Sequence, residues 1–101
     1  MKIAWSEQSR RDITEAVRFW SARDPVAALR TSQTIRRQVA LLKAHPELGR
    51  PGRVVDTREL VVPKTPYVVI YTVDSPRSLL IILRILRSAR NWPASADEDE
   101  A

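Results

Sequence analysis

The stretch HPELGRPGRVVDTRELVVPKTPYVVIYTV, residues 45–73, decides the fold, because the hydrophobic pattern of the chain changes its period here. It holds both glycines of the chain, Gly49 and Gly52, next to Pro46 and Pro51. Glycine and proline are typical of turns, whereas the β-branched and aromatic residues that follow are typical of strands. The stretch therefore predicts a turn that leads from helices into a sheet.

Three strands are predicted from this turn onward. They are VVDTRELVV at 54–62, YVVIYTV at 67–73 and LLIILRIL at 79–86, joined by turns at 64–66 and 74–77. Connections this tight make consecutive strands antiparallel. The third strand is a nearly continuous apolar run, which predicts a central strand covered on both faces.

The residues before the turn predict a short strand and two helices. Residues 1–5 form the strand, and apolar residues recur at helical spacing over 7–22, with Ser6 as the N-cap. Asp24, followed by a proline, caps a second helix that stops near His45, because a proline disfavours helical geometry in the residue before it. So short a break predicts an antiparallel helix hairpin. The expected fold is α+β, with the hairpin packed on a mainly antiparallel sheet.

Length and charge define the organisation and the kind of partner. The chain has 101 residues, which predicts a single domain at 1–93 and leaves an acidic, disordered tail at 94–101. The net charge is +5, and arginine supplies 14 of the 17 basic residues. Four of the 12 acidic residues lie in the last five positions, so the rest of the chain is more basic than the total. Such a domain favours an acidic partner, either nucleic acid or protein.

Composition also argues against several classes of protein. The chain has no cysteine, which excludes disulfides and thiolate chemistry. One histidine and scattered carboxylates give no metal-ligand spacing, so we expect no metal and no cofactor. No apolar run approaches the length of a membrane span and the first residues lack a signal-peptide pattern, which predicts a cytoplasmic protein without membrane contact.

The basic residues of the second half form two groups: Arg50, Arg53 and Arg58 on the turn and first strand, and Arg77, Arg84, Arg87 and Arg90 around the last strand. Exposed charges on an edge strand can simply prevent aggregation. Arg84 is different, because it interrupts an apolar strand and a buried guanidinium must be paired. Its structural explanation is an ion pair to Glu59 or Asp56, and its functional explanation is a basic cleft at the end of the sheet.

Four motifs together carry a resemblance: HPELGRPGRV, TRELVV, PYVVIYTV and ILRILRSARNWP, preceded by a helix hairpin that begins WSEQSRRDI. From Lys2 to Pro93 the chain resembles the ParE/RelE family of toxins from type II toxin–antitoxin modules, and is closer to ParE. The resemblance implies a compact toxin of a plasmid-stabilisation type that causes growth arrest. It also implies neutralisation in a hetero-oligomer by an antitoxin encoded beside it.

Two activities divide this family. RelE-like members are ribosome-dependent endonucleases that cut messenger RNA, and ParE-like members inhibit DNA gyrase without hydrolytic residues of their own. Under the RelE reading the resemblance assigns catalysis to Arg58, Lys64, Tyr67, Tyr71, Arg84 and Arg87. Under the ParE reading it assigns binding of the target or antitoxin to Arg53, Arg58, Arg84, Arg87, Arg90 and Trp92.

Several residues favour the ParE reading. RelE-type nucleases typically carry a basic residue directly after the tyrosine of the matching strand, and here that position is Val68. Tyr67 and Tyr71 share strand parity, which predicts core packing on one side, and His45 is expected at a helix end. A gyrase inhibitor without enzymatic activity is therefore the first hypothesis. A RelE-type endonuclease is the second and a non-toxic basic binding module the third.

Overall fold

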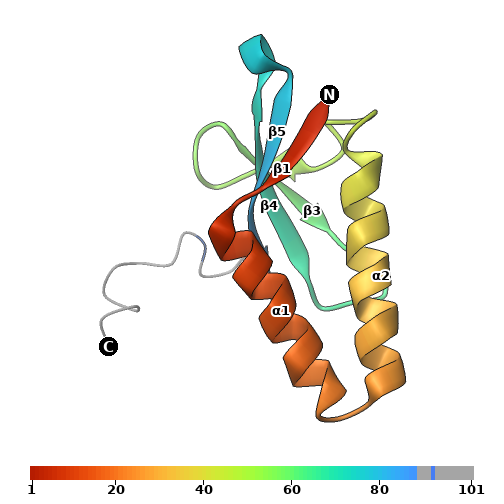
Figure 1. Ribbon diagram of the computed structural model, residues 1–101. Coiled ribbons are helices and arrows are strands. Elements are labelled where there is room, and N and C mark those ends of the chain that lie inside the picture. The colour runs from red at the N-terminus through yellow and green to blue at the C-terminus, as the bar shows by residue number, and fades with distance from the viewer. Residues whose placement is uncertain (89–91, 93–101) are drawn as a thin grey trace.

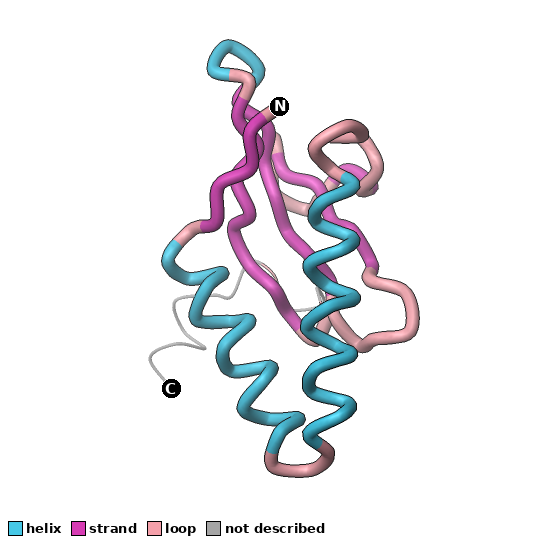
Figure 2. The backbone as a smooth tube through the Cα atoms, turned by 45° about the vertical axis from the view of Figure 1, so that its right-hand side comes forward, coloured by secondary structure: helices cyan, strands magenta, loops and turns pink. Residues whose placement is uncertain are grey.

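A computed structural model describes residues 1–88 and 92 of the chain. Its elements are β1 (Lys2–Trp5), α1 (Glu7–Ser21), α2 (Pro25–Leu41), β2 (Arg50–Pro51), β3 (Thr57–Val61), β4 (Val68–Asp74), a single 3-10 turn η1 (Ser75–Arg77) and β5 (Leu79–Leu86). The two helices lie side by side on one face of the sheet (Figures 1 and 2). The predicted α+β fold, a helix hairpin packed on a sheet, is confirmed.

The sheet has five strands in the order β1-β5-β4-β3-β2. β1 runs parallel to β5, and the other neighbouring strands are antiparallel. Parallel neighbours need a long crossover connection, and α1 and α2 lie within the connection from β1 to the rest of the sheet. β1 and β5 are therefore neighbours although they lie at opposite ends of the described chain, and the two helices that connect β1 to the other strands cover one face of the sheet.

Both helices begin at the predicted caps. The Ser6 side chain accepts a hydrogen bond from the Ser9 amide at the start of α1. At the start of α2, an Asp24 carboxylate oxygen accepts from the amides of Val26 and Ala27, and proline follows the cap. Each cap satisfies amides that a helix leaves without an internal partner.

The main core lies between the helix hairpin and the sheet. It contains Ile13, Ala16, Ile35, Val39, Leu42, Leu60, Val62, Tyr67, Val69, Tyr71, Leu80, Ile82 and Ile85. Along β5, the residues on this side are buried and those between them are only partly buried. A smaller cluster of Val68 and Ile70 with Leu83, Leu86 and Trp92 lies apart from the main core. β5 lies between two strands, as predicted, and its second face is covered only in part by the described residues.

Three details of the predicted elements also differ. The strand predicted at 54–62 begins only at Thr57, because the Thr57 amide donates to the carbonyl of Val54 and closes a turn at 3.1 Å. The two residues of β2 then pair with β3, which was not predicted. α2 ends at Leu41, so His45 lies beyond the helix and is exposed.

Among the described residues, the end of β5 has no neighbouring strand on one side, because β1 stops at Trp5, opposite Ile82. The start of α1 takes over from there. The Ser6 hydroxyl donates to the carbonyl of Leu83 at 3.0 Å. One turn and a half further on, Asp12 Oδ2 accepts the amide of Ile85 at 2.9 Å. Side chains of α1 and its cap thus replace the missing strand and tie the helix to the sheet edge.

Asp12→Ala should therefore destabilise the protein far more than an ordinary surface change. It leaves both the Ile85 amide and the Arg84 guanidinium without their carboxylate, a loss of roughly 2–4 kcal/mol in the free energy of unfolding. Glu15→Ala on the same helix removes an exposed ion pair with Arg18 and is the matched control, which should change stability little. Urea unfolding measures both, and equal effects would contradict the role given to Asp12.

Candidate functional site

The residues predicted to carry function do not gather at one place. Arg58 lies on β3 and Arg84 on β5, with β4 between them. Lys64 lies in the turn between β3 and β4, and Arg87 directly follows β5. Arg90 falls outside the described residues, so its role stays a prediction.

Arg84 is held in a two-pronged ion pair with Asp12. Its Nε lies 2.8 Å from Asp12 Oδ2, and its Nη2 lies 3.2 Å from Asp12 Oδ1. The prediction that Arg84 is paired is confirmed, but the partners predicted from the sequence, Glu59 and Asp56, are wrong. Asp12 was missed because it lies 72 positions away in the chain and only the helix packing brings it to β5.

Glu59 instead holds the turn between α2 and β3. Its carboxylate is almost fully buried and accepts from Arg50 Nη2 and from the backbone amide of Arg53, both at 3.2 Å. A buried carboxylate needs such donors. Arg53, predicted to bind a partner, is thus fixed through its backbone, and its exposed side chain lies at this turn.

Tyr71 and Arg58 fasten the loop before β2 to the sheet. The Tyr71 hydroxyl donates to the carbonyl of Pro46 at 2.7 Å and accepts from the Gly49 amide at 2.8 Å. Arg58, opposite Tyr71 in the register, donates to the carbonyl of Gly49 at 2.6 Å. A Cβ on Gly49 would lie 2.8 Å from the Tyr71 ring, so only glycine fits at this position of the loop. This contact explains a glycine at position 49 without any need for an unusual backbone angle.

Tyr67 has a similar structural contact. It is 3% exposed, and its hydroxyl accepts from the indole Nε1 of Trp20 at 3.2 Å. Tyr71 is 0% exposed. The prediction that both tyrosines pack on one side of the sheet, in the core, is confirmed. Burial also raises the pKa of Tyr71 above its ordinary value of 10.0, so this hydroxyl stays protonated at neutral pH.

Arg87 is exposed and lies over the ring of Phe19. Its guanidinium is 4.6 Å from the ring centroid, and that of Arg23 is 3.7 Å from the same centroid. Arg87 and Phe19 line a hollow of about 260 Å³ between α1 and β5, together with Ile85. The carboxylates of Asp12 and Glu15 also line it, but each is already paired with an arginine. Trp92 follows Arg87 closely in the chain, but it packs on the small cluster around Val68. This hollow combines apolar surface with an exposed cation, which suits contact with a protein partner.

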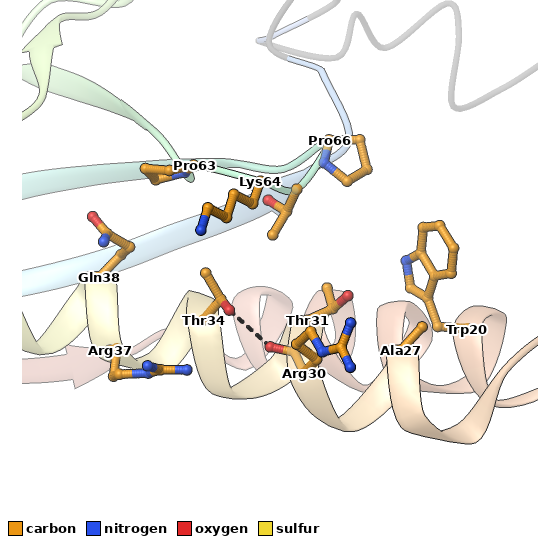
Figure 3. A pocket seen from close by; sticks show the side chains of 11 residues that line it. Trp20, Ala27, Arg30, Thr31, Thr34, Arg37, Gln38, Pro63, Lys64 and Pro66 are labelled. Atoms are coloured by element: carbon orange, nitrogen blue, oxygen red, sulfur yellow. Dashed lines mark hydrogen bonds between the residues drawn. The ribbon is translucent and has the colours of Figure 1, made fainter.

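A larger groove of about 600 Å³ lies between α2 and the turn that joins β3 to β4. Lys64 extends from the turn over α2, above Thr34 and with its end toward Gln38 (Figure 3). Arg30 and Arg37 of α2 line the same groove. These two arginines were missed among the candidate residues. The signal was present, because residues 25–46 contain no aspartate or glutamate.

Two further observations concern the part of the chain that the structure describes. Within it, no three histidine, aspartate or glutamate side chains are grouped so that they could hold a metal ion. None of its helices is both long enough and apolar enough to cross a bilayer.

Comparison with known proteins agrees with this architecture. Residues 3–92 match the family described as "ParE toxin of type II toxin-antitoxin system, parDE". The chain is 33% identical over 92 residues to "Putative toxin Y4kP" of Sinorhizobium fredii, covering 91% of this chain and 93% of that protein. It also superimposes on a chain of the "Chromosomal ParDE TA system from P. aeruginosa" with a TM-score of 0.76 and 27% identity, covering 84% of this chain and 92% of the other. The fold and the match define a toxin of a type II toxin–antitoxin system, and the chain belongs to the ParE toxin family.

The loop contacts make Tyr71→Phe a destabilising change. Removing the hydroxyl leaves the Pro46 carbonyl and the Gly49 amide without their partner, which should lower the free energy of unfolding by about 1–3 kcal/mol. Tyr67→Phe removes one longer hydrogen bond and is the matched control, with a smaller loss. Chemical denaturation of both variants tests this ranking, and a Tyr67→Phe loss as large as that of Tyr71→Phe would contradict it.

The raised pKa of Tyr71 predicts a loss of stability at alkaline pH. The unfolded tyrosine titrates near pH 10 and the folded one above it, so the folded state disfavours the phenolate. The stabilisation is fully present below about pH 10 and is lost as the pH rises through the raised pKa. Unfolding measured from about pH 8 to about pH 12 should show this decline. The decline should be smaller in Tyr71→Phe. Equal slopes of the free energy of unfolding against pH in the variant and the wild type would contradict the assignment to Tyr71.

Proposed function

We propose that this protein is a growth-arresting cytoplasmic toxin that inhibits DNA gyrase by binding, and that a partner antitoxin neutralises it. The observation that carries this proposal is that four of the six side chains an RNA-cleaving mechanism would use are already engaged in holding the fold. Tyr67, Tyr71, Arg58 and Arg84 each make the structural contacts described above.

Nuclease chemistry would need these groups to be accessible. A general acid or base must come within about 2.6–3.2 Å of the atom with which it exchanges a proton. Both tyrosines belong to the buried core and their hydroxyls already make hydrogen bonds, and the Tyr71 pKa is raised, whereas a base at neutral pH needs the opposite shift. Val68, the position where RelE-type nucleases typically carry a basic residue, is also buried. This arrangement favours the gyrase hypothesis over the endonuclease hypothesis.

Binding needs only an exposed and complementary surface. Arg87 and Phe19 at the hollow between α1 and β5 provide an exposed cation beside an aromatic ring. Arginine and aromatic residues often contribute most of the binding energy at protein interfaces. We therefore assign the main contact with a protein partner to this hollow, together with Arg90.

The antitoxin partner follows from the family and from the ParDE system whose chain this protein resembles. An antitoxin segment with apolar side chains and carboxylates would fill the hollow and pair with Arg87. If the same residues contact gyrase, occupation by the antitoxin neutralises the toxin. Complex formation can be tested by co-expression and size-exclusion chromatography with the protein encoded by the neighbouring gene.

Purified components distinguish the two activities. The wild-type chain should inhibit gyrase supercoiling and increase gyrase-dependent cleavage of plasmid DNA, and it should leave messenger RNA on ribosomes intact. Tyr67→Phe should keep this inhibition, because its hydroxyl takes no part in chemistry. Codon-dependent messenger cleavage by the wild type that is lost in Tyr67→Phe or in folded Tyr71→Phe would establish the endonuclease instead.

The contact surface has its own test in the same gyrase assay. Arg87→Glu, alone or with Arg90→Glu, should weaken inhibition at least tenfold while circular dichroism shows an unchanged fold. Arg77→Glu makes the same charge change at the other end of β5, where Arg77 is exposed, and should leave inhibition unchanged. Full inhibition by the folded double variant would refute the assignment of Arg87 and Arg90.

A further inference from the structure

One surface of the molecule carries cations that the proposed contact hollow does not use. Six basic residues lie along α2 and beside it: Lys2, Arg30, Arg36, Arg37, Lys43 and Lys64. We call this set the α2 basic band. It lies on the α2 side of the hairpin, whereas the hollow with Arg87 lies between α1 and β5.

Three hollows join these residues into one surface. Arg30, Arg37 and Lys64 line the groove of Figure 3. Arg37 also lines a second hollow, which it shares with Arg36. Arg36 in turn lines a third hollow with Lys2 and Lys43. No carboxylate lines any of the three, so the positive charge is continuous along the band.

The cations of the band also lack carboxylate partners among the described residues. On α1 the arginines alternate with acids, and Arg11 and Arg18 form ion pairs with Glu7 and Glu15. On α2 no acid occurs between Asp24 and Glu47. Arg36 lies 5.6 Å from the centroid of the Trp5 ring, and Arg37 makes only a long bond of 3.5 Å to a backbone carbonyl. The charges of this helix are therefore available to an anionic ligand.

The shape of the band favours an extended polyanion over a small anion. Arg30 and Lys43 are 13 positions apart, which corresponds to ~20 Å along a helix. One strand of duplex DNA carries a phosphate every ~3.4 Å along its axis, so the band matches about six phosphates. Thr31 and Gln38 add neutral donors in the groove, and hydroxyl and amide groups of this kind commonly contact phosphate oxygens.

The side chains present favour a duplex over a single strand. Proteins that bind single strands use exposed aromatic rings on which bases stack. Among residues 1–88 and 92, no aromatic side chain is exposed, and Trp5 already lies beneath Arg36. The band offers contacts to a phosphate backbone and no platform for bases.

We propose that the α2 basic band binds the phosphate backbone of duplex DNA without sequence preference. The choice of DNA rests on the proposed function, because gyrase acts on duplex DNA and a toxin bound to gyrase is close to it. The band and the Arg87 hollow lie on different sides of the helix hairpin, so protein contact and DNA contact are compatible. Together they would hold the toxin at the protein–DNA junction.

Fluorescence anisotropy of the purified full chain with a labelled duplex of about 20 base pairs, longer than the band, tests this proposal. The variant Arg30→Gln, Arg37→Gln, Lys64→Gln removes three charges from the groove. Glutamine suits position 64 because Lys64 has a φ of 65°, a strained angle that lysine and glutamine share equally. The control variant Arg10→Gln, Arg11→Gln, Arg18→Gln removes the same charge from exposed positions on α1.

The groove variant should bind the duplex at least tenfold more weakly at about 100 mM salt, and its plot of log affinity against log salt should flatten by roughly 2.7 units. The control variant should lose much less affinity. Equal losses in both variants, or no binding by the wild type at about 50 mM salt, would overturn the proposal. Tighter binding to duplex RNA, to single-stranded DNA or to poly-glutamate than to duplex DNA would also overturn it. A preference for poly-glutamate would assign the band to an acidic protein segment. The gyrase assay is a separate readout, so loss of the proposed function and loss of DNA binding are distinguishable.

Discussion

The early end of β1 is the constraint on which much of this structure depends. Because β1 stops opposite Ile82, the second half of β5 has a neighbouring strand, β4, on one side only among the described residues. Asp12 of α1 fills that position, accepting from the Ile85 amide and from Arg84 at once. This one carboxylate fixes α1 beside β5 and pairs with the guanidinium of Arg84 in the apolar strand. It also lines the hollow that contains Arg87.

The small number of polar side chains in the interior also bears on function. A domain of this size has few polar side chains in its interior, and those of the main core are engaged in architecture. Tyr71 and Arg58 hold the loop at Gly49, Glu59 holds the turn that follows, and Tyr67 bonds Trp20. Arg87 and the cations of the α2 basic band are among the charges that stay exposed at the surface, and they are suited to binding. This division supports a toxin that acts by occupying its target, with the chemistry left to the target enzyme.

Much of the fold was predictable because it rests on local signals. Ser6 and Asp24 mark the helix starts, and the change of hydrophobic period marks the beginning of the three consecutive antiparallel strands. It was predictable that Arg84 is paired, since a guanidinium in an apolar strand needs a carboxylate. Which carboxylate it pairs with was not predictable. Asp12 becomes that partner only through packing between segments far apart in the chain. β2 was missed because two residues that include a proline carry no strand pattern. The α2 basic band was missed because it carries no motif and is marked in the sequence only by the absence of acids over residues 25–46.

The most direct test of the central claim, that this toxin acts by binding gyrase and not by cutting RNA, is the state of DNA and messenger RNA in cells shortly after the chain is induced without its antitoxin. If gyrase is the target, the cells should filament, keep their messenger RNA intact and carry double-strand DNA breaks that disappear when gyrase is depleted. Intact DNA together with messenger RNA cleaved at codon-defined positions would contradict it.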